Sequence, residues 1–249
     1  MDFRYPRRVV PAEPQVSFHV FGQVLCDDLI NLQRRLVYEA GSQDQGLISV
    51  LLCEHEPVIT MGRRGSREHI RFSEQELAQR EWELMPVQRG GGCVLHGPGQ
   101  LAVYIVAPIA RLHWSVGNYL QRLQTGIVKS LQALRCEVHT RPQVCGVWGH
   151  SGLLVSFGIG VRHGIASFGV YVNVANDLAD WQNIATMPGD CAPYMGSLLS
   201  ENVAAGRIEI VRAPLMEQLS LALASTKTSI HAGHSLLPVK PIIAREHAA

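Results

Sequence analysis

The segment Arg89-Gly-Gly-Gly-Cys-Val-Leu-His-Gly-Pro-Gly-Gln100 is the most informative part of this sequence. Its three consecutive glycines lack Cβ atoms, so the backbone there reaches positive φ freely and approaches a ligand closely, with its N–H groups exposed. Pro98 and Gly99 suit the second and third positions of a type II turn. An apolar stretch of strand length, 101–107, follows directly. We therefore expect a loop that encloses a small molecule between two strands.

A glycine triplet alone is also common in hairpins that bind nothing. Nucleotide-binding loops are a second alternative, but the segment lacks the Gly-x-x-x-x-Gly-Lys-Ser/Thr pattern and does not open a helix with Gly-x-Gly-x-x-Gly. The complete string with Arg89, His96, Pro98 and Gln100 is more specific than its glycines. It favours a pocket for a small molecule other than a nucleotide.

Composition limits the classes of protein to consider. The chain has 249 residues, 47% of them hydrophobic, which is ample for one core. A formal net charge of +1 gives no electrostatic footprint for nucleic acid or an anionic membrane. No apolar run is long enough to span a bilayer, and no signal peptide is evident. Six widely spaced cysteines without a Cys-x-x-Cys pair suit a reducing compartment. We expect a cytoplasmic protein with no nucleic-acid or membrane partner.

Periodicity along the chain predicts one α/β domain between two segments of little structure. We expect a loose arm over residues 1–12, the domain over residues 13–225, and a low-structure tail over residues 226–249. Hairpins mixed with helices favour a mixed, largely antiparallel sheet with helices packed on it. The expected strands are 47–53, 58–61, 101–107, 144–148, 153–161 and 166–174.

Capping residues predict where the helices begin. Asp27 or Asp28 suits the cap of a first helix, and Ser115 suits the cap of a long third one. Ser73-Glu-Gln-Glu76 is a capping box for a short helix between them. Pro214 suits the first turn of a closing helix.

Four further blocks keep a fixed order around the Gly-rich segment. They are Glu54-His-Glu-Pro-Val-Ile-Thr-Met-Gly-Arg63, Gly146-Val-Trp148, Ser156-Phe-Gly158 and Gly169-Val-Tyr-Val-Asn-Val174. Together with residues 89–100 they resemble the lipoyl/octanoyl transferase family over roughly residues 45–200. The resemblance implies the biotin/lipoate ligase-type α/β (α+β) fold, a single domain with a mixed sheet flanked by helices.

The resemblance also implies an acyltransferase of lipoate biosynthesis that needs no cofactor and no metal. Members of the family take an octanoyl group from acyl carrier protein onto a cysteine and pass it to a lysine of a lipoyl domain. These two proteins are the implied partners, and we expect a monomer. The residues expected to bind the substrate are Arg89, Gly90, Gly91, Gly92, Cys93, Val94, Leu95, His96, Ser156, Phe157, Gly158, Gly169, Val170 and Tyr171.

Three chemically active positions of the family carry inert residues here. The lysine position is Leu153, the cysteine position is Gly189, and the histidine position is Phe168. Cys191, two residues after Gly189, is the catalytic nucleophile that we predict, with an ordinary loop cysteine as the alternative. Asp190 opposes this role, because a neighbouring carboxylate raises the pKa of a thiol.

Several charged residues have a functional and a plain interpretation. Arg162 or His163 can supply positive charge to the thiol, although nothing in the sequence places them there. The cluster of Arg63, Arg64 and Arg67 suits contact with an acidic carrier as well as it suits a solvated loop.

The other polar candidates in the sequence do not form a recognisable catalytic or metal-binding set. His96 suits a pocket wall or turn anchor better than a general base, and Ser156 lacks the partners of a serine nucleophile. The spacing of Cys53, His55 and His69 matches no standard zinc site.

Two other functions stay open at the level of sequence. A non-catalytic acyl- or lipoyl-binding module fits the loss of three active groups while the pocket glycines remain. An ATP-dependent lipoate or biotin ligase of the same fold fits less well, because such enzymes also need a lysine near position 153.

Overall fold

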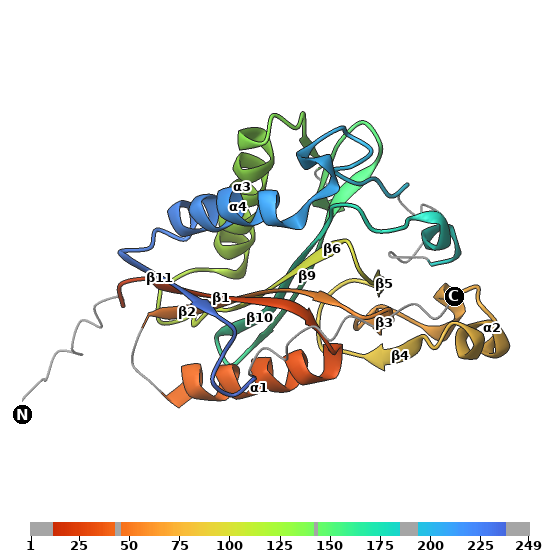
Figure 1. The fold of residues 1–249 in the computed structure, drawn as a ribbon. Coiled ribbons are helices and arrows are strands. Elements are labelled where there is room, and N and C mark those ends of the chain that lie inside the picture. Colours follow the sequence, from red (N-terminus) through yellow and green to blue (C-terminus); the bar gives the residue numbers. More distant parts are fainter. Residues whose placement is uncertain (1–11, 43–45, 142–143, 185–193, 238–249) are drawn as a thin grey trace, which may run out of the picture.

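The computed structural model describes residues 12–42, 46–141, 144–184 and 194–237. A large sheet with the strand order β11-β1-β2-β6-β10-β9-β8-β7 runs through the middle of the molecule (Figure 1). Its strands are β1 (Gln15–Val24), β2 (Leu47–His55), β6 (Gln100–Val106), β7 (His139–Arg141), β8 (Val144–Trp148), β9 (Leu153–Arg162), β10 (Ile165–Asn173) and β11 (Lys227–Ala232).

Helices cover both faces of this sheet. Two of them, α3 (Val116–Ala133) and α4 (Ile208–Ala222), lie on one face, and α1 (Cys26–Ser42) lies on the other (Figure 1). A second sheet, in the order β4-β3-β5, stands beside α1 on the same side as the short helix α2. Its strands and that helix are β3 (Val58–Met61), β4 (Glu83–Pro86), β5 (Cys93–His96) and α2 (Glu74–Gln79).

The large sheet is mixed, as expected. Strand β1 pairs in parallel with β2 and β11, and α1 makes the crossover between β1 and β2. The remaining five pairs in this sheet are antiparallel. The expected mixed, largely antiparallel sheet flanked by helices is therefore confirmed.

Alternation along the strands divides the buried side chains into two layers. Successive side chains of a strand point to opposite faces. In β6, Leu101, Val103 and Ile105 pack toward α3 and α4, whereas Ala102 and Tyr104 face α1 and the small sheet. We call the first layer the helix-side core and the second the site-side layer, because the Gly-rich segment lies in the second.

Two of the four predicted helix starts are confirmed. Ser73 and Glu76 form a reciprocal capping box at α2, and the Ser115 hydroxyl accepts a hydrogen bond from the Asn118 N–H at the start of α3. The turn at 97–100 also has the expected geometry, since Gly99 has a φ of +83° and the Gln100 N–H donates to Gly97 O at 3.1 Å.

Two helix starts differ from the prediction. Helix α1 begins at Cys26, so Asp27 and Asp28 lie in its first turn and neither caps it. Their carboxylates interact favourably there with the positive end of the helix dipole. Helix α4 begins at Ile208, so Pro214 lies inside the helix. A stripe of buried residues outweighs the lost hydrogen bond of the proline: Ile208, Val211, Leu215 and Leu219.

The predicted low-structure tail contains a strand. Residues 227–232 form β11, which pairs along β1 from Gln15↔Lys227 to Val20↔Ala232. The segment is polar because β11 is an edge strand with mostly exposed side chains, so the apolar alternation that marks buried strands is missing. The predicted arm, apart from residue 12, lies outside the described residues, as do Gly189 and Cys191.

None of the helices in the described ranges combines the length and the apolar character that a membrane span requires.

Close contact between β10 and β6 makes a specific demand on Gly169. A Cβ atom at Gly169 would lie 2.0 Å from the Val103 carbonyl oxygen, whereas a Cβ atom at Gly97 would meet nothing within 4 Å. We expect Gly169→Ala to lower the free energy of unfolding by about 2 kcal/mol or more, because the backbone of a central strand must move. Urea denaturation measures this. Gly97→Ala is the control and should stay within about 1 kcal/mol of the wild type; equal losses in both variants would contradict the steric argument.

Candidate functional site

The buried guanidinium of Arg89 holds the Gly-rich loop in place. The side chain is 1% exposed. Its Nη1 donates to the carbonyl oxygens of Gly90 and Gly92, both at 3.0 Å, and its Nη2 donates to Thr60 O at 2.9 Å and Thr60 Oγ1 at 2.8 Å. No carboxylate among the described residues pairs with it. Arg89 thus ties its own loop to β3 through neutral acceptors.

Two glycines leave room for this side chain. A Cβ atom at Gly158 in β9 would lie 2.7 Å from Arg89 Cδ. One at Gly62 would lie 2.7 Å from Arg89 Nη1 and 2.6 Å from Gly91 O. The glycines of two separate sequence blocks are therefore explained by one arginine that crosses between them.

The loop backbone is bonded to the protein more than the sequence suggests. The Gly90 N–H donates to Ile159 O at 2.9 Å, so it is not bared toward a ligand as expected. The carbonyl oxygens of Arg89, Gly91 and Gly92 accept hydrogen bonds from the backbone N–H groups of residues 62–64. The segment is a rigid wall between β3 and β9.

A chain of buried polar side chains runs from Arg89 across the site-side layer. Thr60 Oγ1 lies 2.8 Å from His96 Nε2, and His96 Nδ1 lies 2.7 Å from Gln100 Oε1. Gln100 Nε2 donates to Asn173 Oδ1 at 3.0 Å, and Asn173 Nδ2 donates to Gly196 O at 3.1 Å. This relay joins β3, β5, β6 and β10 to the segment that begins at residue 194.

The neighbours of His96 determine which of its ring nitrogens carries the hydrogen. Because an amide oxygen only accepts, His96 Nδ1 carries the hydrogen, and Nε2 accepts from the Thr60 hydroxyl. Burial, and then the nearby charges of His55 and Arg89, hold the pKa of His96 well below its ordinary value. A neutral His96 with both nitrogens engaged acts as an anchor of the loop, in agreement with the preference for a turn anchor over a general base.

A second buried cluster lies beneath the first. His55 Nδ1 donates to Val24 O at 2.8 Å, and Tyr104 OH donates to His55 Nε2 at 2.8 Å. Burial lowers the pKa of His55 to about 4. Burial also raises the pKa of the Cys26 thiol to about 11 and that of Cys53 well above its usual value. These two cysteines are thus thiols near neutral pH and poor nucleophiles.

His69, the third residue of the sequence set weighed for zinc, is engaged elsewhere. Its Nδ1 accepts a hydrogen bond from the Ser66 N–H in the short 3-10 helix η1 (Arg67–His69). No three metal-binding side chains gather anywhere in the described part of the chain.

The structure brings most predicted site residues into the site-side layer. Cys93, Val94 and Leu95 are buried there in β5, and Tyr171 lies with its ring 4.7 Å from that of His96 and below the Arg89 guanidinium. Ser156 and Gly158 pair with residues of β10 on the same face.

Phe157 and Val170 point the other way. Their side chains belong to the helix-side core. Strand alternation therefore leaves only their main chains facing the site-side layer.

Leu153 begins β9 next to the segment that follows Cys191 in the sequence. Its N–H donates to Tyr194 O at 2.8 Å, and the Gly196 N–H donates back to its carbonyl oxygen at 3.1 Å. The side chain is 1% exposed in the site-side layer. The position at which the family carries lysine thus lies at the Asn173 end of the relay.

Arg162 and His163 lie at the far end of β9. Nine residues separate Arg162 from Leu153 along one strand, a distance of about 30 Å. They therefore do not supply positive charge beside Leu153.

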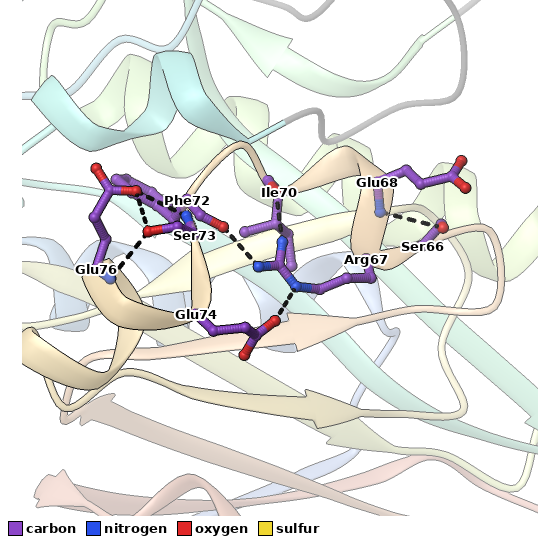
Figure 2. A network of polar contacts seen from close by, with 8 residues as sticks. All are labelled: Ser66, Arg67, Glu68, Ile70, Phe72, Ser73, Glu74 and Glu76. Carbon is purple, nitrogen blue, oxygen red and sulfur yellow. Dashed lines mark hydrogen bonds and ion pairs between the residues drawn. The ribbon is translucent and has the colours of Figure 1, made fainter.

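The arginines near the Gly-rich loop have different environments. The guanidinium of Arg67 is partly exposed but engaged by acceptors of its own segment: it bonds to Glu74 Oε1 at 2.8 Å, Ile70 O at 2.7 Å and Phe72 O at 2.6 Å (Figure 2). Arg63 and Arg64 are exposed, on a turn whose backbone is fixed to the loop. Two of the three predicted carrier-binding arginines are available at the surface.

Three residues of the relay were missing from the predicted site: Thr60, Gln100 and Asn173. All three lie within the motif blocks, but only the folded chain shows that they join Arg89 and His96 in one relay. A buried polar residue inside an apolar strand, such as Asn173 in β10, was the available signal.

The two buried histidines make stability depend on pH. Both have a folded-state pKa below the unfolded value of 6.5, so their stabilising effect is complete above pH 6.5 and decreases as the pH falls toward about 4. His55 alone should contribute a loss of about 3 kcal/mol over this window. We expect the unfolding free energy of His96→Gln, measured by urea titration, to decrease less steeply than that of the wild type as the pH falls. The exposed His139→Gln should keep the wild-type slope, and a flattened slope there would contradict this assignment.

Sequence comparison places the chain among known proteins. The family model described as lipoyl protein ligase A/B catalytic domain matches residues 28–194, more than half of the chain. An octanoyltransferase of Geobacter sp. (strain M21) is 35% identical over 157 residues, 63% of this chain and 72% of that protein. An octanoyltransferase of Pseudomonas fluorescens is 28% identical over 219 residues, 86% of this chain and 96% of that protein.

Structural comparison agrees on the fold. A putative lipoate protein ligase from Thermoplasma acidophilum with bound lipoic acid matches with a TM-score of 0.69 and 14% identity, covering 90% of this chain and 91% of that one. Lipoate-protein ligase A bound with ATP matches with a TM-score of 0.63 and 16% identity, covering 88% of each. The chain therefore belongs to the lipoyl/octanoyl transferase family.

Proposed function

We propose that this protein transfers an octanoyl group from acyl carrier protein to a lysine of a lipoyl domain. The observation that carries the proposal is the convergence of the family's motif blocks around Arg89. That side chain bonds Thr60, packs on Gly158 and lies over Tyr171, so three separate blocks meet at the Gly-rich loop. The octanoyltransferase relatives do not favour the non-catalytic alternative.

The chemistry requires two acyl transfers in sequence. The cysteine gives up its proton, and its thiolate attacks the carbonyl carbon of the octanoyl thioester. The bond to the carrier sulfur breaks, the carrier leaves as a thiolate that takes up a proton, and the protein holds a new thioester. The acceptor lysine, as a free amine, then attacks that carbonyl. An amide forms, the cysteine leaves as thiolate, and the proton lost by the amine restores the thiol.

Cys191 is our candidate for the nucleophile. The described buried cysteines have raised pKa values, which oppose the thiolate that this step needs. Tyr194, three residues after Cys191 in the sequence, bonds to Leu153 at the head of β9. Since Leu153 carries no charge, this position does not supply the cation that the resemblance implies for stabilising the thiolate.

The exposed arginines Arg63 and Arg64 are our candidate contact for the acyl carrier protein. Their turn is fixed to the Gly-rich loop, because the Arg63 N–H donates to Arg89 O and the Arg64 N–H donates to Gly91 O. The segment after this turn is fixed by the hydrogen bonds of Arg67 to Ile70 O, Phe72 O and Glu74 Oε1 (Figure 2). Two positive charges beside the acyl site suit a carrier with an acidic surface.

Transfer is tested with purified protein, octanoyl-acyl carrier protein and a lipoyl domain. We expect intact-mass spectrometry to show octanoylation of one lysine of the domain. Cys191→Ser should slow this by about 10³-fold or more, because it removes the nucleophile. The exposed Cys145→Ser is the control and should react like the wild type.

The outcomes separate the claims. No modified lysine with wild-type protein at any concentration would overturn the proposed activity. Equal rates for the wild type and Cys191→Ser would overturn only the assignment of the nucleophile. Binding of octanoyl-acyl carrier protein without transfer would support the non-catalytic alternative.

The carrier contact is tested by reversing its charge. We expect Arg63→Glu with Arg64→Glu to raise KM for octanoyl-acyl carrier protein about tenfold at low salt, and less at high salt. KM for octanoyl-N-acetylcysteamine, a neutral donor without a carrier, should not change. Arg34→Glu with Arg35→Glu on α1 makes the same change of charge elsewhere and should have no effect. An equal rise of KM for both donors would point to damage of the acyl site and contradict a docking role.

A further inference from the structure

Phe168 has an unusual backbone conformation in the middle of β10. Its φ is +60°, in the left-handed region that large L residues rarely adopt. Such a residue costs of order 1–3 kcal/mol and persists only where its surroundings hold it. Residues in such conformations cluster at active sites and ligand-binding sites.

The conformation turns the Phe168 ring to the opposite face of the sheet. Ala166 and Val170, two residues before and after it, both pack in the helix-side core. So does Ile159, its cross-strand partner in β9. By regular alternation Phe168 would join them, yet its ring packs in the site-side layer, 6.3 Å from the ring of Tyr104.

A dedicated buried group stabilises this arrangement. Gln33 of α1 is 2% exposed, and its Oε1 accepts the Phe168 N–H at 2.6 Å. The next residue, Gly169, lies so close to Val103 that no side chain fits there. The reversed ring is therefore a built feature of the packing between α1 and β10.

The position of Phe168 along β10 suggests what the ring does. Asn173 bonds to Gly196 and Leu153 at one end of the strand, which is the reacting end under the proposed function. Tyr171, beside Arg89 and His96, follows. Phe168 lies five residues from Asn173, about 16 Å along the strand, where its N–H meets Gln33 of α1.

We infer that Phe168 is the end wall of the acyl site and sets the length of the acyl chain that it accepts. The inference rests on the proposed function. A straight saturated chain that enters at the Asn173 end and runs along β10 past Tyr171 reaches the Phe168 ring next in the same layer. The ring stops it from passing between α1 and the sheet, and its reversed backbone is what places it there.

Chain-length preference tests this role. Phe168→Gly removes the ring and adopts positive φ without strain. We expect it to raise the ratio of kcat/KM for dodecanoyl over octanoyl donors about tenfold or more, the discrimination typical of apolar pockets. Phe168→Trp should raise the hexanoyl-to-octanoyl ratio instead. Phe168→Leu, a milder change, should shift preference in the same direction as glycine, and is used if glycine prevents folding.

A matched control separates specificity from general damage. Phe72 is also buried in the site-side layer, beside Trp82 and α2. Phe72→Leu should keep the wild-type ratios even if overall activity falls. Unchanged ratios in all Phe168 variants, or equal shifts in Phe72→Leu, would overturn the inference while leaving the proposed transfer intact.

A second readout distinguishes the inference from the proposed function. If the wild type transfers no acyl group, the proposed function fails, and calorimetry with octanamide and dodecanamide tests Phe168 directly. Tighter binding of dodecanamide by Phe168→Gly than by the wild type is the expected result. No binding of either amide to any form would overturn the inference too.

Discussion

A buried positive charge that pairs with no carboxylate in the described part of the chain is the constraint on which this structure depends. Arg89 is enclosed by carbonyl and hydroxyl oxygens, and these hold the loop against β3 while the side chain passes over a glycine of β9. Burial of a guanidinium is tolerable only if most of its donors are satisfied, so the backbone that accepts from Nη1 and Nη2 has little freedom. Its Nε finds no partner among the described residues. The glycines at 62, 90–92 and 158 are best understood as the space and the acceptors that this one side chain requires.

The protein keeps the walls of its family's site but not the charges at its reacting end. Leu153 occupies the lysine position in an apolar environment, and the charged residues on the same strand lie at its other end. Electrostatic help for a thiolate is therefore weak at this position, whereas the uncharged relay through His96 is complete. Under the proposed function, such a site holds the acyl chain in a fixed orientation, and the activation of the nucleophile has to come from groups other than Leu153.

Local chemistry made much of this fold predictable, and long-range packing accounts for the rest. The capping box at Ser73, the turn at Gly99 and the strand pattern around 101–106 depend on residues close in sequence, and each was predicted. Strand β11 was not predicted, because an exposed edge strand has no apolar alternation. The reversed orientation of the Phe168 ring was not predicted either, because its backbone is stabilised by a glutamine 135 residues away. In the same way, the motif blocks identified the walls of the site, but the relay through Thr60 and Asn173 needs partners from several strands.

Pairing between the two ends of the chain has a consequence for how the protein is made. Strand β1 lies between β2 and β11, so one of its edges stays open until residues 227–232 leave the ribosome. During that interval a nearly complete sheet exposes the unpaired N–H and C=O groups of an apolar strand, which is a template for aggregation. Newly made chains should therefore be most in need of chaperones until residues 227–232 have emerged, and deletion of β11 should harm yield in cells more than it harms the chemistry.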